Sequence, residues 1–513
     1  MDKFLINKET SKAEILYVLN LIKSNASFNS AKYANNLFKT MFSDSSIAQS
    51  FCCGPSKVSY TSTFGLGPYF EDKLYDILEK VPIYTVSFDE SYNKVTNKEQ
   101  MDFNVRYWDD SRSQIVNRYL GSQFLGHTTA GDLLSAFNEG TRRLDESKML
   151  QIGMDGPNSN LRFLKDLNLK RDSKDLPKLI DIGTCGLHVI HGAFRAGFTA
   201  TGWKIDSILK SLFYVFDESP ARRADFTTYT GCEVFPLSFC GTRWIDDRPV
   251  AERAIELWPH VTKYVNIINS GPKSKIPKCA SYLILSKAIN DSTALAKLNV
   301  FVNIAKDFEP FLTKFQSNAP LVPFLNEELG LILKSLLEMF VKPSVIQSSK
   351  YIADLIKIDI EDTSNYLPTR KVCIGFASSE YLKRIDISEA VLSEFKLACQ
   401  MCYKTIVVKL FKRGSSPCNY KLVSDIICLS PRYMINHPNS TIDKFEAVLS
   451  KFVHHKFVKM ADGDDIMKQY KNTVKFMKEE KKKECGEYVC GKSKRIDEFF
   501  FELLGNLPEY GKL

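Results

Sequence analysis

"LQIGMDGPNSN", residues 150–160, carries an apolar, strand-like stretch into Asp155 and then into a turn that begins at Gly156 and Pro157. A buried strand that ends on a carboxylate places an acid at the edge of a sheet. One acid alone predicts little chemistry, so its meaning depends on which polar residues reach the same edge. The local alternative is that Asp155 opens an Asx-turn with Gly156.

Period-two alternation of apolar and polar residues predicts further strands around this stretch. Three precede it, over residues 81–91 (ending near Asp89), 101–108 and 114–126, and a fifth follows over 178–185. Helical spacing predicts helices between the third and fourth strands, with Thr128 or Thr129 as N-cap, and between the fourth and fifth. A last helix follows the fifth strand and is expected to stop at Gly197.

The predicted elements follow the chain order of an RNase H-like fold: three strands, a helix, a strand, a helix, a strand and a helix. The sequence therefore predicts an α/β fold with a mixed five-stranded sheet and helices on both faces. In that layout the first and fourth strands are neighbours, so Asp89 and Asp155 should lie side by side at one end of the sheet. The alternative for Asp89 is that it only caps a turn.

The rest of the chain shows mainly helical periodicity. We expect an N-terminal helical segment over residues 1–80, the RNase H-like core over 81–200 and a large, mostly helical insertion over 201–500. Residues 501–513 would then be a truncated return to the core.

Composition limits the class of protein. With 44% hydrophobic and 25% charged residues, the chain is that of an ordinary globular protein. No run of about 18 apolar residues and no secretory leader is evident, so we expect an intracellular soluble protein that does not enter a membrane. The 13 cysteines have no framework spacing, which favours free thiols.

Positive charge gives a weak indication of a polyanionic partner. The net charge is +9, and residues 471–495 hold nine basic and four acidic residues. Such a run is usually a solvated helix face, and contact with nucleic acid is the less common alternative.

Two carboxylates at adjacent strand ends can hold a hard divalent cation. Mg²⁺ prefers oxygen ligands and keeps several waters, and two metals can drive phosphodiester chemistry. Asp89 and Asp155 are therefore the candidate ligands for Mg²⁺ or Mn²⁺.

Other candidate sites are weaker. Cys185, His188 and His191 are spaced for one helix face, but zinc sites need a fourth ligand and wider spacing, so we expect no zinc and assign these residues to packing and hydrogen bonding beside the acids. "CQMC", residues 399–402, has no second ligand pair nearby and is assigned to the core. Arg243 and Trp244 could contact a phosphate and stack on an unpaired base, or could simply be packed.

Taken in order, "VSFDES" at Asp89, "MDGPNSN" at Asp155, "CGLHVIH" at Cys185 and "TRW" at Trp244 resemble the hAT-type DNA transposase superfamily over about residues 80–260. The resemblance implies an RNase H-like catalytic core, a helical insertion, a nuclear location and DNA as the partner, bound with weak sequence specificity. It implies that Asp89 and Asp155 are the first two metal-binding catalytic acids. His188 would act in the catalytic site with Cys185 and His191 in support, and Arg243 and Trp244 would contact DNA.

The sequence also departs from that superfamily. The third acid, a Glu in a helix after the insertion, and the dimerisation segment beyond it are not evident, since Glu498, Glu502 and Glu509 lack the expected context. No N-terminal Cys/His array resembles a zinc finger. We therefore expect a transposase-derived protein that is catalytically incomplete and retains DNA binding. The alternatives are an active transposase that cuts and joins DNA, and a protein-interaction scaffold that does not bind DNA.

Overall fold

The computed structural model describes residues 3–272, 276–347, 352–414 and 420–505. Its sheet has four strands, in the spatial order β3-β2-β1-β4. The strands are β1 (Tyr84–Asn93), β2 (Lys98–Asp109), β3 (Gln114–Leu125) and β4 (Met149–Gly153). β2 pairs antiparallel with β1 and with β3, whereas β4 runs parallel to β1, so the sheet is mixed.

The predicted fifth strand is not formed. Residues 178–185 run beside β4 but make only two backbone hydrogen bonds to it and its extension, from Ile180 N–H to Leu150 O (2.8 Å) and from Cys185 N–H to Met154 O (2.9 Å). Two isolated bonds do not make a ladder, and Ile180 packs into the core of the C-terminal helices instead. The prediction of a five-stranded sheet was therefore wrong for this structure.

One face of the sheet is buried by helices α5 (Gly67–Lys80), α6 (Ala130–Gly140) and α7 (Asn158–Ser173). Alternating residues of β1 and β2 pack against aromatic rings of the helices, and Phe88 meets Phe163 edge-on at 5.3 Å. Of the two N-caps that the sequence offered, Thr128 and Thr129, the structure uses Thr129, which forms a capping box with Asp132.

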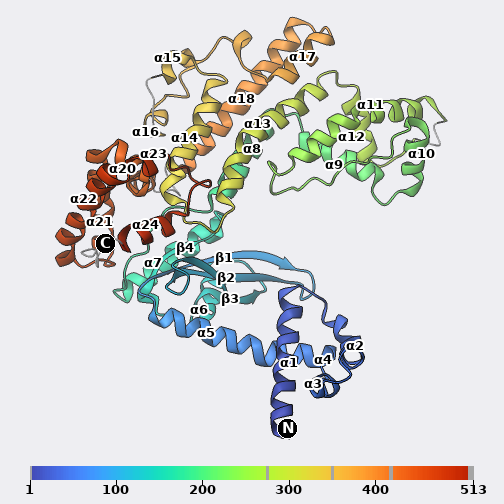
Figure 1. Cartoon of the computed structure of the whole chain (residues 1–513). Helices are drawn as coiled ribbons and strands as arrows, with labels where there is room; N and C mark the ends of the chain where they lie inside the picture. The colour runs from blue at the N-terminus through green and yellow to red at the C-terminus, as the bar shows by residue number, and fades with distance from the viewer. Residues whose placement is uncertain (1–2, 273–275, 348–351, 415–419, 506–513) are drawn as a thin grey trace.

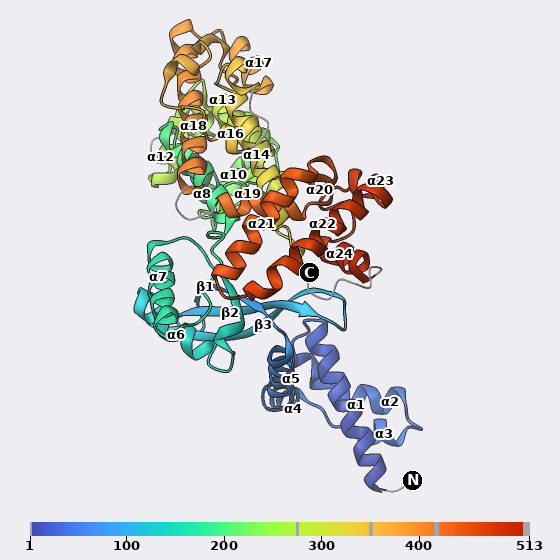
Figure 2. The ribbon, with the colours of Figure 1, turned by 90° about the vertical axis from the view of Figure 1, so that its left-hand side faces the viewer.

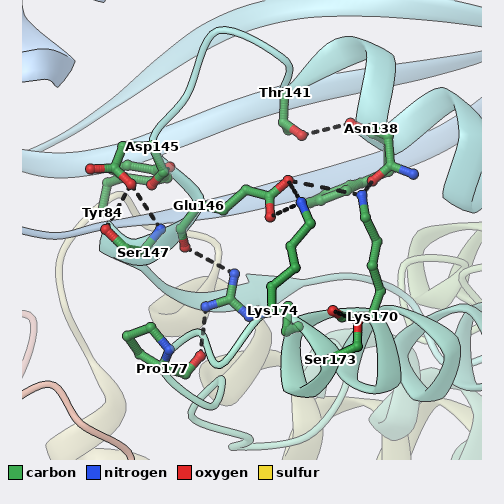
Figure 3. Close-up of polar contacts among 12 residues, drawn as sticks. Tyr84, Asn138, Thr141, Asp145, Glu146, Ser147, Lys170, Ser173, Lys174 and Pro177 are labelled. Carbon is green, nitrogen blue, oxygen red and sulfur yellow. Dashed lines mark hydrogen bonds and ion pairs between the residues drawn. The ribbon is translucent and has the colours of Figure 1, made fainter.

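Polar contacts fasten β4 and α7 to the neighbouring loops. Tyr84 donates a hydrogen bond to Asp145 O (2.7 Å), and Lys174 binds Glu146 (Figure 3). The Arg171 guanidinium is buried and donates to the carbonyls of Glu146 and Pro177. These bonds hold the strand that leads to Asp155.

The N-terminal segment is helical, as predicted, and has its own small core. Its helices extend away from the sheet, on the side opposite the later helices (Figures 1 and 2). They are α1 (Lys3–Lys23), α2 (Ala34–Met41), α3 (Ser46–Ser50) and α4 (Pro55–Tyr60).

The chain after residue 185 is helical and forms two separate cores. The first core contains α8 (Gly186–Ala200), α9 (Ile205–Phe216), α10 (Pro220–Thr230), α11 (Arg248–Ser270), α12 (Ala280–Ile289), α13 (Ala294–Phe315), α14 (Val322–Glu338), α15 (Pro343–Ile346), α16 (Ile352–Leu355), α17 (Phe376–Arg384) and α18 (Glu389–Gly414). The second contains α19 (Tyr420–Ile426), α20 (Pro431–Asn436), α21 (Pro438–His454), α22 (Gly463–Glu480), α23 (Lys482–Gly486) and α24 (Ile496–Gly505). The chain returns to the sheet at α24, which contacts β3, and Phe501 lies 5.5 Å from the Trp108 ring.

The sequence led us to expect that helix α8 stops at Gly197. In the structure α8 continues to Ala200. Gly197 is buried where α8 crosses α18, and a Cβ at this position would lie 2.4 Å from Ile406 Cγ1. The glycine thus permits close packing of two helices rather than ending one.

Candidate functional site

Asp89 lies in β1, and Asp155 lies two residues beyond the end of β4, the neighbouring parallel strand. The last aligned pair of β1 and β4 is Ser87 and Gly153, and each aspartate lies two residues further along its own segment. Since alternate residues of a strand point to the same side, both carboxylates reach the same region. They line one cavity of about 600 Å³. Gly153 allows β4 to lie close to β1, because a Cβ at this position would lie 3.0 Å from Ser87 Cβ.

The two carboxylates influence each other electrostatically. The pKa of Asp89 is raised, first by partial desolvation within the cavity and then by the charge of Asp155. His188 and Arg243 oppose this rise because their positive charges favour the ionised carboxylate. The site therefore contains two acids and two bases that act on one another.

Helix α8 brings His188 to Asp155. The helix begins directly after Cys185, and His188 follows one turn later on the same side. His188 Nδ1 lies 2.8 Å from Asp155 Oδ1. Hydrogen bonds to Asp155 and to Cys185 raise the pKa of His188 to about 10, although partial burial acts in the opposite direction.

Cys185 completes a compact group with these two residues. Burial would raise the pKa of its thiol, but hydrogen bonds from the His188 side chain and backbone outweigh that effect, and the net pKa is lowered. One donor atom from each of Asp155, Cys185 and His188 lies within 4.8 Å of the other two. The structure thus gathers three chemically different ligand atoms at one point of the cavity.

His191 lies apart from this group. Its side chain is 4% exposed, and its Nδ1 accepts a hydrogen bond from Ile245 N–H (3.3 Å). Burial lowers the pKa of His191 and keeps the ring neutral. His191 therefore packs α8 against residues 245–246.

Arg243 lies on the surface, whereas Trp244 lies in the core. Arg243 is exposed and lines the cavity with the two aspartates. Trp244 is only 6% exposed, donates from Nε1 to Gly241 O (3.1 Å) and meets the Phe239 ring edge-on at 5.5 Å. In this structure the indole is not available to stack on a base, which favours the packed alternative over the DNA contact that the resemblance implies.

No third acid from the helical region lines the cavity within the described part of the chain. Glu498 lies 4.0 Å from Arg495, and Glu502 pairs with Lys494. Glu509 lies outside the described residues.

Sequence reasoning missed Thr405 and Lys409 of α18. They line a second cavity of about 600 Å³, together with Asp155, His188 and Arg195. Lys409 and Arg195 are exposed there. No local pattern could reveal this contact, because it depends on the packing of α18 against α8 across more than 200 residues of chain.

Glu90 was also missed. It lies next to Asp89 in β1, receives a hydrogen bond from the buried Asn160 amide (3.4 Å), and has a raised pKa, mainly from desolvation. The only sequence feature that could have pointed to Glu90 is its position directly after Asp89. By strand alternation, however, it projects from the opposite face of β1.

Two motifs singled out in the sequence lie elsewhere. Cys399 and Cys402 of "CQMC" are fully buried in the first helical core, and burial raises the pKa of both thiols, which supports a packing role. The basic run over 471–495 falls on α22, α23 and the turns beyond, where Lys481 pairs with Glu484 and Arg495 with Asp497.

A scan against models of known protein families gives no match, and a search of curated proteins finds no similar one. Among the described residues, no helix combines the length and the apolar character needed to cross a lipid bilayer.

Proposed function

We propose that the chain derives from a DNA transposase of the hAT type and binds DNA without cutting it. The observation that carries the proposal is that Asp89 of β1 and Asp155, two residues beyond the end of β4, line one cavity together with Arg243. The spatial order of the four strands places the first beside the fourth, as an RNase H-like core requires. On this proposal the protein acts in the nucleus.

The acids fit one hard divalent cation better than two. Two carboxylates with access to water suit a single Mg²⁺ or Mn²⁺ ion. A second ion needs a further acid, and the helix that packs beside Asp155 presents Lys409 instead. Loss of one metal removes stabilisation of the developing charge worth several kcal/mol, so strand cleavage is expected to be absent.

Exposed cations around the acids support DNA binding. Arg243 lines the first cavity, and Arg195 and Lys409 line the second, so three positive side chains surround Asp155 and His188. Cations spaced along a groove bind phosphates independently of sequence, which agrees with weak sequence specificity.

Titration of a labelled hairpin DNA at two salt concentrations tests this proposal. We expect binding at low salt that weakens steeply as salt rises, because phosphate contacts release counterions. Arg243→Gln and Lys409→Gln should each lower the log–log salt slope by about one. Arg162→Gln is the matched control, since Arg162 pairs with Asp166 on α7 and lines neither cavity. An equal loss in all three variants would contradict a specific role for the cavity.

An active transposase is the enzyme alternative. Incubation of end-labelled DNA with Mn²⁺ separates it from our proposal. We expect intact DNA. Nicking that disappears in both Asp89→Asn and Asp155→Asn would establish the enzyme instead.

A protein-interaction scaffold is favoured by one different observation. Large aromatic side chains are exposed along α4 and α5 and the π-helix that joins them, namely Tyr60, Phe64, Tyr69 and Phe70. Tyr60 and Phe64 stack on each other at 5.7 Å. Exposed apolar patches of this kind mark interaction surfaces. Absence of DNA binding at low salt would favour the scaffold over our proposal.

A further inference from the structure

Asp155, Cys185 and His188 offer a carboxylate oxygen, a sulfur and an imidazole nitrogen within 4.8 Å of one another. All three residues line the cavity of about 600 Å³, so an ion and water can reach them. From the sequence we expected no zinc here, because Cys185, His188 and His191 lack a fourth ligand and the usual zinc spacing. In the structure His191 does not join the cluster, and Asp155 stands as the third ligand beside Cys185 and His188.

The backbone holds the three donors in place. Cys185 directly precedes α8 and His188 lies one turn into the helix, so the spacing of these two is set by helix geometry. Asp155 is tied to the same point because Cys185 N–H donates to Met154 O (2.9 Å). The ligands therefore come from two segments, the end of β4 and the start of α8, which a backbone hydrogen bond already joins.

The His188–Asp155 distance is close to that in a tetrahedral zinc site, and the sulfur of Cys185 lies within 4.8 Å of both donor atoms. Zinc takes nitrogen and oxygen ligands at about 2.0–2.1 Å and sulfur at about 2.3 Å, which places its nitrogen and oxygen donors roughly 3.3 Å from one another. His188 Nδ1 and Asp155 Oδ1, now 2.8 Å apart, need to separate by roughly half an ångström. The His188 side chain is 44% exposed and can make that adjustment.

We propose that Asp155, Cys185 and His188 bind one zinc ion, with the fourth position open to water from the cavity. A thiolate and a carboxylate balance the charge of Zn²⁺, and the thiolate selects zinc over Mg²⁺. On binding, the thiol and the imidazolium each release a proton to solvent, and only metal–ligand bonds form.

The zinc site does not depend on the proposed DNA binding. It does share Asp155 with the Asp89–Asp155 pair, so zinc should exclude a hard cation that needs both aspartates. The zinc site uses sulfur and the hard-cation site uses Asp89, and this difference allows them to be tested separately.

Cobalt(II) is the probe for the zinc site, because thiolate ligation gives a sulfur-to-cobalt charge-transfer band in the near ultraviolet. We titrate the full chain, freed of metal, with Co²⁺ and then with Zn²⁺. The band should saturate at one equivalent and disappear when Zn²⁺ displaces the cobalt. His188→Asn should weaken cobalt binding at least about tenfold, because the loss of even an outer-shell partner of a metal ligand typically costs that much.

Three further variants make the result specific. Cys185→Ser should abolish the band, whereas Cys52→Ser, at an exposed cysteine of the N-terminal segment, should leave it unchanged. Asp89→Asn should retain the band, because Asp89 is not a ligand of this site. His188→Asn keeps the test decisive if Cys185→Ser fails to fold, since the His188 side chain is 44% exposed. Absence of the band, or full retention of it in Cys185→Ser or His188→Asn, would overturn the proposal.

Discussion

His188 is held between the Asp155 carboxylate and the Cys185 thiol, and these contacts set its charge. Its pKa is raised from 6.5 to about 10 by hydrogen bonds to both groups. In metal-free protein we expect the imidazole to remain protonated at pH 8, as measured by its NMR titration. Asp155→Asn should move the midpoint down towards the ordinary value, because the hydrogen-bonded anion is lost.

The sign of the effect on stability follows from the same shift. The folded pKa lies above the unfolded one, so the contribution to stability is fully present below about pH 6.5 and is lost as pH rises through about 10. Asp166→Asn, which removes an acid paired with Arg162 on α7, is the control and should leave the His188 midpoint unchanged. A midpoint near 6.5 in the unmodified chain would contradict the assignment.

Asp247 is a buried acid of the segment that carries Arg243. Its side chain is 2% exposed; one oxygen accepts from Cys240 N–H (2.7 Å), and the other is buried without a hydrogen-bond partner. Burial raises the pKa of Asp247 to about 7. The folded protein therefore holds a proton that the unfolded chain releases, and stability falls as pH rises from about 4 to 7.

Asp247→Asn should remove this pH dependence. At pH 8 we expect the variant to gain about 1–3 kcal/mol in free energy of unfolding, because the amide carries no charge. Urea unfolding at pH 5 and pH 8 measures both values. The variant and the unmodified chain should differ much less at pH 5, and an equal difference at both pH values would contradict a buried, titrating carboxyl.

The packing of α8 against α18 is the element-scale feature that shapes the second cavity. At Gly197 an added Cβ would meet Ile406 at 2.4 Å and Cys402 O at 3.0 Å. Gly197→Ala should therefore lower the free energy of unfolding by about 1–3 kcal/mol, the usual cost of overpacking. Gly192→Ala, in the same helix with nothing within 4 Å, should raise it by up to about 1 kcal/mol.

Chemical denaturation of both variants decides this prediction. Their effects should have opposite signs. Equal effects would mean that helix propensity alone, and not the contact with α18, governs these positions.

Elements with local signals were predictable, and elements that depend on distant contacts were not. The alternation in β1 and the N-cap at Thr129 depend only on residues close together in the sequence, and the structure has both. Residues 178–185 carry the apolar pattern of a strand, but Ile180 and Ile182 pack with the C-terminal helices. Gly197 has the ordinary signature of a helix end, and only the approach of α18 explains why it lies inside the helix.

At the scale of the whole molecule, the candidate site combines predictable and unpredictable parts. The meeting of Asp89 and Asp155 follows from strand order, and the contact of His188 with Cys185 follows from helix spacing. The position of Lys409 depends on a helix far along the chain, and the burial of Trp244 depends on the first helical core. Sequence patterns therefore indicated the acids but not the charges that surround them.

On the proposed function, Asp89 and Asp155 together hold a divalent cation, and Mn²⁺ binding followed by electron paramagnetic resonance tests this most directly. We expect one weakly bound ion per chain, because Asp155 already shares its charge with His188. Asp89→Asn and Asp155→Asn should each weaken binding at least about tenfold. Cys185→Ser and the control Asp166→Asn should leave it unchanged, whereas no Mn²⁺ binding, or binding that survives both aspartate substitutions, would contradict the claim.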